Sequence, residues 1–384
     1  MKANVLERYH SQDNYYSEGE GLQNSKWRGK YAEFQGLKGE IQRDNWMNAC
    51  NGRAPDGTAL RRQQRGSRAG WDITLSASKS VSLKALVDQD PEILEAHRKA
   101  VESTVQYIEE NCIHAQIKRN GEVISEQTQQ GHFALFEHDD NRNQDPQLHT
   151  HVVVLNQTLC SDGKSRTLDS RELFNQKKTI GAIYDHHLAY ELKQQVYRLN
   201  WTSDHTFEID GYAKEQLEEF STRRQEICEY LERQNISLEQ ATEEQKTVAC
   251  LESRAAKVHK LSPVDHEIQH QAWTKLADDL GIEHPQPQQE LENLYQSPSH
   301  PGSIAEVIES ALESATAQQV AVKKQELLRE CLRYSQGFYK PRAIARAIEL
   351  DERLIATNDQ RLTSEKILKR EHFILKAAER ATGG

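Results

Sequence analysis

The sequence lacks the features that would place it in a membrane or in an oxidising compartment. No run of about 18 apolar residues occurs, so we expect no membrane-spanning helix. The first residues contain no apolar stretch long enough for a signal peptide. The six cysteines are scattered and form no Cys-x-x-Cys pair, a pattern typical of free thiols in a reducing compartment. We therefore expect a soluble cytoplasmic protein that does not insert into a membrane.

A phosphate-binding loop is also missing. No Gly-x-x-x-x-Gly-Lys-[Ser/Thr] run occurs in the 384 residues, so the chain shows no motif for ATP hydrolysis. The length nevertheless allows two or three domains.

Positive charge is scarce overall, but the shortage is uneven. The net charge is -10 at pH 7, and residues 205–320 hold 22 acidic and 9 basic residues. In contrast, the stretch from Arg53 to Arg68 carries five arginines and a single acidic residue, Asp56. Local charge rather than net charge determines contact with phosphates, so the composition does not exclude DNA. The simpler alternative for the arginine cluster is a solvated loop.

The hydrophobic pattern indicates an α+β domain followed by helical segments. Mainly antiparallel strands are expected at 71–76, 123–126, 131–138 and 149–156, and helices at 79–87, 91–111 and 179–198. Residues 213–280 are almost wholly helical in pattern and strongly charged. Four prolines mark 284–302 as a linker, and 303–380 is expected to form three or four short amphipathic helices.

Three histidines form the strongest chemical signal. His149 and His151 alternate with Thr150, so in a strand their side chains would project from one face about 7 Å apart. His138 ends the preceding strand, and the polar connection allows a hairpin with all three imidazoles on one face. Such a set can hold a metal ion with open positions for substrate. The alternative for the pair alone is polar residues alternating with valine on a half-buried strand.

A second feature is the run around Asp72. Asp72 falls on the polar face of its strand, where it can act as a base or as the partner of a ligand imidazole. Ser78 is placed to cap the following helix, whose first N–H groups suit a phosphate. The alternative is an edge-strand aspartate followed by an ordinary capped helix.

Tyrosines gather near the start of the chain, at Tyr9, Tyr15 and Tyr16. A tyrosine hydroxyl beside a divalent ion is a usable nucleophile toward a phosphodiester. The alternative is that these aromatic rings pack on the core.

Taken together, these features resemble the relaxases of conjugative plasmids, specifically the TrwC/TraI-like (MobF) group of HUH endonucleases. Residues 71–82, WDITLSASKSVS, resemble that family's DLTFSAPKSVS motif, and the spacing of the histidines fits its three-histidine motif. The Tyr15-Tyr16 pair, followed by Trp27-Arg28-Gly29-Lys30, looks like its N-terminal signature.

The resemblance implies a palm of antiparallel β-sheet flanked by helices, with helical fingers that close over single-stranded DNA. The relaxase domain would cover 1–283, with fingers at about 213–283, a linker at 284–303 and a helical segment at 304–384. That last segment resembles the lead-in to a helicase domain that is absent here, so we expect the chain to be the nicking half of a larger protein.

The implied activity is reversible, sequence-specific nicking of single-stranded DNA at a plasmid origin of transfer, through a 5′-phosphotyrosyl intermediate. His138, His149 and His151 would hold a divalent ion, Mg²⁺ or Mn²⁺ by resemblance, although three imidazoles by affinity favour zinc, nickel or copper. Asp72 would orient a histidine or take the tyrosine proton. Tyr9 would initiate the reaction, although the family normally has a longer N-terminal segment and a first tyrosine pair, and Tyr15 or Tyr16 would resolve it. The candidate DNA contacts are basic residues: Arg61, Arg62, Arg65, Arg68, Lys79 and Arg142.

The implied partners are origin DNA and other proteins of the transfer and secretion-coupling complex, with the chain acting as a monomer. Three alternatives remain open. The first is a rolling-circle replication initiator or transposase of the HUH superfamily, and the second is a metal-dependent hydrolase or isomerase of small molecules. The third is a non-catalytic DNA-binding or partner module.

Overall fold

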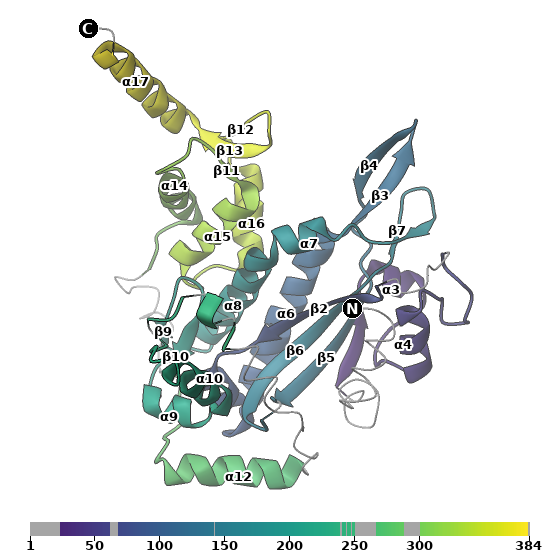
Figure 1. Cartoon of the computed structure of the whole chain (residues 1–384), viewed down its shortest axis with the longest axis vertical. Helices are drawn as coiled ribbons and strands as arrows, with labels where there is room; N and C mark the ends of the chain where they lie inside the picture. The colour runs from purple at the N-terminus through teal and green to yellow at the C-terminus, as the bar shows by residue number, and fades with distance from the viewer. Residues whose placement is uncertain are drawn as a thin grey trace. The chain divides into compact units, whose positions relative to one another are not determined.

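The computed structural model describes residues 24–61, 68–141, 143–238, 240–242, 244–246, 248–249, 266–287 and 300–382. Six predicted site residues lie outside these described residues: Tyr9, Tyr15, Tyr16, Arg62, Arg65 and Arg142. The chain divides into two compact units. The first contains the chain up to Glu95, His114–Leu168 and Glu208–Gln286, and the second contains Ala96–Ile113, Asp169–Phe207 and the chain from Pro287 onward. The mixed fold of helices and antiparallel strands confirms the α+β prediction (Figure 1).

A four-stranded antiparallel sheet forms the centre of the first unit. Its strand order is β1 (Ser25–Arg28), β5 (Phe133–Asp140), β6 (Pro146–Leu155) and β2 (Gly70–Ser76). The alternating patterns around β2, β5 and β6 therefore predicted real strands, and the predicted hairpin of β5 with β6 is confirmed. The polar connection between these two strands matches the turn that such a hairpin needs.

Two short helices cover part of one sheet face. They are α3 (Lys30–Phe34) and α4 (Arg43–Cys50), and Trp46 of α4 packs edge-on against Phe136 with ring centroids 5.2 Å apart. Burial of each such aromatic side chain stabilises the fold by about 1.5–3 kcal/mol. Gly29 joins β1 to α3 with φ at 99°, and a Cβ there would lie 2.3 Å from the carbonyl oxygen of Gly131. Only glycine fits this close approach between two backbones.

Further elements of the first unit surround the sheet. Helix α5 (Lys79–Leu86) packs against β6, and α6 (Pro91–Cys112) begins in this unit and continues into the second. Two hairpins complete the set: β3 (His114–Arg119) with β4 (Glu122–Gln127), and β7 (Thr158–Leu159) with β8 (Ser165–Arg166).

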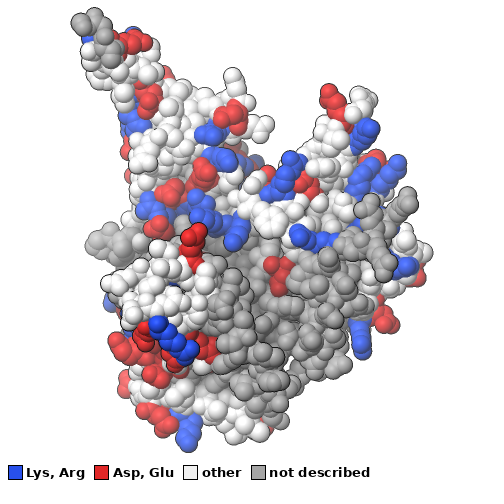
Figure 2. Space-filling view, viewed as in Figure 1, with Lys and Arg blue, Asp and Glu red and all other residues white. Residues whose placement is uncertain are grey.

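The region predicted as helical fingers contains α9 (Lys214–Glu219), α10 (Thr222–Glu232) and α12 (His266–Asp279). A small apolar cluster joins it to α5, with Leu83, Phe220, Trp273 and Ala277 buried together. Figure 2 shows acidic side chains gathered over α9 and α10, in agreement with the acidic composition of this stretch.

The second unit contains α7 (Arg171–Asn175), α8 (Lys177–Gln194) and β9 (Leu199–Trp201), which pairs with β10 (Phe207–Ile209). After the predicted linker come α14 (Ile304–Ala315), β11 (Val322–Lys323), α15 (Lys324–Ser335), α16 (Pro341–Leu350), β12 (Leu354–Ala356), β13 (Arg361–Ser364) and α17 (Glu365–Thr382). Helices α14, α15, α16 and α17 agree with the three or four amphipathic helices expected for this segment, but the three-stranded sheet of β11, β12 and β13 was not predicted. Strands of two to four residues are too short for a clear alternating pattern.

No helix in the described ranges is long and apolar enough to cross a lipid bilayer.

Candidate active site

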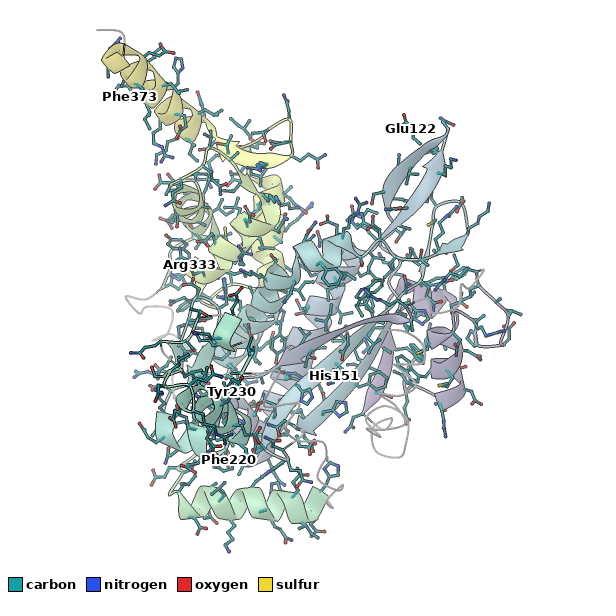
Figure 3. All side chains as sticks on the ribbon, in the orientation of Figure 1. Glu122, His151, Phe220, Tyr230, Arg333 and Phe373 are labelled. Carbon is teal, nitrogen blue, oxygen red and sulfur yellow. The ribbon has the colours of Figure 1, made fainter. Side chains whose placement is uncertain are left out.

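The sheet register brings the three predicted histidines together. His138 of β5 lies opposite His149 of β6, and His151 lies opposite Phe136. Directly opposed residues of an antiparallel pair point to one face, and so do residues two apart in a strand. The ring centroids are 5.3 Å apart for His138 and His149, 5.5 Å for His138 and His151, and 5.1 Å for His149 and His151. Figure 3 labels His151 on the central sheet.

Hydrogen bonds fix the tautomers of two of these rings. Nδ1 of His149 lies 2.8 Å from the carbonyl oxygen of Gln147, and Nδ1 of His151 lies 2.9 Å from both carboxylate oxygens of Asp72. A carbonyl and a carboxylate only accept, so Nδ1 carries the hydrogen in both rings. The lone pair of each neutral ring is then on Nε2, the nitrogen available for coordination.

The donor set fits a divalent ion. A metal–nitrogen bond of about 2.1 Å places each ring centroid about 3.2 Å from the ion, so three such rings lie about 5 Å apart. The observed centroid separations of 5.1–5.5 Å agree with this arrangement. Among the described residues, however, no group of three His, Cys, Asp or Glu side chains is already closed around an ion position. Small rotations of the rings would therefore accompany metal binding.

Burial favours the coordinating form of His149. Its ring is 6% exposed, and this burial lowers the pKa of His149 to about 4. The imidazole is therefore neutral at physiological pH, as a metal ligand must be.

Asp72 reaches His151 from the neighbouring strand. Asp72 pairs with Val153, and Thr74, two residues further along β2, lies directly opposite His151. The Asp72 carboxylate therefore approaches His151 diagonally across the sheet, on the polar face that the alternation predicted. The side chains of His151 and Asp72 are only 13% and 15% exposed, which protects their hydrogen bond from water.

Lys79, a predicted DNA contact, is half-buried. Its Nζ donates to the carbonyl oxygen of Pro146 at 2.8 Å, and burial lowers the pKa of Lys79 to about 8. In this position Lys79 ties the start of α5 to the start of β6.

The first turn of α5 is capped by Glu208, a contact that the sequence did not predict. Glu208 accepts a hydrogen bond from the backbone N–H of Ser80 at 2.8 Å, and Ser80 Oγ accepts one from the N–H of Ile209 at 2.7 Å. Ser78 stands at the N-cap position, but within the described structure its side chain makes no capping hydrogen bond, so that expectation was wrong. A carboxylate, rather than a phosphate, takes the N–H of Ser80.

The two described arginines of the predicted DNA-binding cluster differ in setting. Arg61 is half-buried and donates from Nη2 to the carbonyl oxygen of Asn156 at 3.3 Å. Arg68 is exposed, with its guanidinium over the ring of Trp71 at 5.5 Å from the centroid.

Helices α10 and α12 hold the loop that joins His138 to His149, which the sequence did not predict. Trp273 Nε1 of α12 donates to the carbonyl oxygen of Gln144 at 2.9 Å, and Gln269 Nε2 donates to Asp140 at 3.0 Å. From α10, Thr222 Oγ1 donates to Asp145 at 2.6 Å. These bonds fix the turn between the two histidine strands.

The chain enters β1 at the end of β5 that carries His138. The carbonyl oxygen of Asn24 accepts a hydrogen bond from the N–H of Glu137 at 3.0 Å, and Ser25 pairs with Phe136. Asn24, the first described residue, therefore lies beside Glu137, the neighbour of His138 in β5.

Comparisons with known proteins agree on one family. A family model described as TrwC relaxase matches residues 2–280. Two proteins named multifunctional conjugation protein TraI, from Escherichia coli and from its strain K12, are 33% and 32% identical over 287 residues. Each match covers 72% of this chain and 15% of the relative, so the chain corresponds to a small part of the length of these relatives.

Solved structures show the same similarity. The conjugative relaxase TrwC in complex with origin-of-transfer DNA matches in a metal-free form, with 35% identity and a TM-score of 0.67, and in a metal-bound form, with 34% and 0.66. Both matches cover 74% of this chain and 98% of the TrwC chain. A copper-bound form of the same complex matches with 34% identity and a TM-score of 0.65.

Proposed function

Because the chain belongs to the TrwC relaxase family, we propose that it is a conjugative relaxase that nicks and rejoins single-stranded DNA at an origin of transfer. Relaxases of this family are DNA-nicking transesterases. The observation that carries the proposal is the cluster of His138, His149 and His151 on one sheet face, with Asp72 bonded to His151. A similar relaxase has been solved with DNA that comprises a recognition hairpin and a cleavage site.

In the proposed reaction a tyrosine hydroxyl oxygen attacks the phosphorus of one phosphodiester. The bond between phosphorus and the 3′ oxygen breaks, the tyrosine loses its proton, and the leaving oxygen gains one to become a 3′-hydroxyl. The phosphate stays on the tyrosine as a 5′-phosphotyrosyl ester, and the reverse reaction rejoins the strand. Both oxygens of Asp72 face His151, which supports an orienting role for this carboxylate.

The three histidines would hold a divalent ion, Mg²⁺ or Mn²⁺ as the working ion, with zinc, nickel or copper as the ions that imidazoles prefer. A bound ion supplies Lewis-acid stabilisation of the charge on the phosphoryl oxygens. The metal-bound and copper-bound forms of the TrwC complex support a requirement for a divalent metal.

Tyr9 would be the initiating nucleophile, with Tyr15 or Tyr16 as the resolving one. The entry of the chain into β1 beside Glu137 supports a nucleophile from the segment before Asn24. An extended chain spans about 3.3 Å per residue, so the segment before Asn24 is long enough for each tyrosine to reach the histidines.

DNA would be bound by the predicted basic residues. The exposed position of Arg68 supports a role in DNA contact, whereas the buried ammonium of Lys79 fits a role in positioning β6. The protein would act as a cytoplasmic monomer together with other proteins of the transfer complex.

The proposal is tested by cleavage of a labelled single strand that carries the transfer origin of its own plasmid, with Mn²⁺ or Mg²⁺ present. The chain should cut this strand at one position. His149→Ala and His151→Ala should abolish cutting while DNA binding persists, and His372→Ala, an exposed histidine of α17, should cut normally. Unchanged cutting by the first two variants would refute the assignment of the site. Cutting of replication-origin DNA alone would favour a rolling-circle initiator.

A further inference from the structure

Residues 303–364 form a recognisable module that lies outside the region matched by the family model, residues 2–280. Its elements follow the order α14, β11, α15, α16, β12, β13, and its antiparallel strands are arranged β11-β13-β12. A helix, a strand, two helices and a two-stranded hairpin in this order, with the first strand beside the last, make a winged helix. Figure 1 labels these elements.

The helix pair inside this module has the features of a helix-turn-helix. Helix α15 ends at Gln336 and Gly337, both with positive φ (45° and 75°), and α16 begins with Pro341. A short turn with glycine between two helices is typical of this motif. Leu328 and Leu332 of α15 are buried in one cluster with Ile344 and Ile348 of α16, so the second helix is held in a fixed orientation.

The outward face of α16 is basic near its N-terminus. Arg342 and Arg346 lie one turn apart, with side chains 65% and 66% exposed, and Ala343 beside them is small and exposed. The N-terminal half of the second helix is the part of a helix-turn-helix that meets base edges in the major groove. Arginine is the side chain whose fork matches guanine and phosphate.

Further cations flank this helix, and the N-terminal half of α16 carries no acidic residue. Lys324 at the start of α15 is 44% exposed, and Arg361 on the wing is 43% exposed. The charged side chains of α14, by contrast, are all acidic: Glu306, Glu309 and Glu313. Acidic residues also lie at the C-terminal end of α16, at Glu349, and on the wing, at Asp359, so it is the N-terminal half of α16 that is purely basic.

The ion pairs of these cations are weak and can exchange. Arg342 pairs with Glu110 at 3.3 Å, Arg346 with Glu349 at 3.1 Å, and Lys324 with Glu349 at 2.7 Å. Arg361 pairs with Asp359 at 3.1 Å. Exposed pairs of this kind contribute about 0–1 kcal/mol. A phosphate backbone, with its dense negative charge, can therefore replace these carboxylates.

We propose that this winged helix binds duplex DNA, with α16 in the major groove and Arg361 of the wing on the backbone. This function is separate from the proposed cleavage of a single strand. It gives the chain a second DNA-binding site, for double-stranded DNA, whose residues take no part in the histidine site.

The test is the affinity of the full chain for a short DNA duplex without transfer-origin sequence. The double variant R342A/R346A should bind this duplex at least about tenfold more weakly at 0.1 M salt. Its plot of log affinity against log salt should be less steep by up to two units, because two cations that neutralise DNA charge are lost. The matched control is K369A/K376A, which removes two exposed lysines of α17 and the same net charge.

The control variant should keep most of the duplex affinity, and both variants should cut the origin single strand normally. The proposal is overturned by unchanged duplex binding in R342A/R346A, or by an equal loss in both variants, which would indicate diffuse charge. A loss confined to single-stranded DNA would also overturn it. Since both arginines are exposed, R342A/R346A should keep the thermal unfolding midpoint of the unaltered chain. Cutting of the origin strand by the same samples tests the nicking proposal separately.

Discussion

Both carboxylate oxygens of Asp72 lie 2.9 Å from Nδ1 of His151, across two adjacent antiparallel strands. The contact follows from the sheet register, because Thr74 faces His151 directly and Asp72 lies two residues away on the same face. A carboxylate behind an imidazole fixes the ring orientation and raises the basicity of its other nitrogen. The strand alternation thus places Asp72 where it can orient the ring of His151.

Asp72→Asn should weaken metal binding. The variant keeps an oxygen that can accept from Nδ1 but loses the negative charge, and loss of such a partner costs about 10- to 100-fold in metal affinity. Calorimetric titration with Mn²⁺ checks this, with Asp56→Asn, a substitution in the loop after α4, as control. Equal Mn²⁺ affinity in Asp72→Asn and the unaltered chain would contradict the orienting role.

Trp273→Phe should impair cutting through the loop between the histidine strands. The substitution removes the hydrogen bond to the carbonyl oxygen of Gln144, which is worth about 1 kcal/mol, and also loses ring area. Trp27→Phe is a control for the ring, because Trp27 Nε1 has no hydrogen-bond partner among the described residues. Urea unfolding and the cutting rate are measured on the same variants. Normal cutting by Trp273→Phe would show that the hydrogen bond from α12 to Gln144 does not support the site.

Glu208→Ala should lower the free energy of unfolding by about 1–2 kcal/mol, because the N–H of Ser80 loses its acceptor at the start of α5. Glu208→Gln retains an acceptor oxygen and should cost less, about 0.5–1 kcal/mol, through loss of charge at the helix N-terminus. Glu215→Gln, on the exposed side of α9, serves as the control. Identical urea midpoints for Glu208→Ala and the unaltered chain would be incompatible with this capping role.

His132 should make stability depend on pH. Burial lowers the pKa of His132 to about 3, so below its ordinary pKa of 6.5 the unfolded chain binds a proton that the folded chain does not. Its contribution is therefore fully present above pH 6.5 and is lost as the pH falls toward 3, with a slope approaching 1.4 kcal/mol per pH unit.

His132→Asn retains an acceptor for Gln157, which donates to His132 Nδ1 at 2.8 Å, and removes the titrating ring. The variant should be less stable at pH 7.5, because it leaves a cavity, but its deficit should shrink by about 1 kcal/mol at pH 5.5. Urea unfolding at the two pH values checks this. A deficit that is the same at both would contradict the prediction.

The central sheet could be read from the sequence, whereas the contacts that support it could not. Alternation in 149–156 is a local signal, so the strand, its hairpin with β5 and the shared face of the histidines were predictable. The bonds of Glu208 to Ser80 and of Trp273 to Gln144 join residues 128 and 129 positions apart. No local pattern marks such partners, and the hydrogen bond of Lys79 to Pro146 likewise depends on the folded register.

The most direct test of the account is to locate the covalent link between protein and DNA. The chain is incubated with Mn²⁺ or Mg²⁺ and single-stranded DNA from its transfer origin, and the adduct that survives SDS is digested and analysed by mass spectrometry. The account predicts a nucleotide esterified to Tyr9 and no such adduct from Tyr9→Phe. An adduct on Tyr15 or Tyr16 would preserve the chemistry and overturn the assignment of the nucleophile. Tight DNA binding without any adduct would contradict the central claim that this chain is a transesterase.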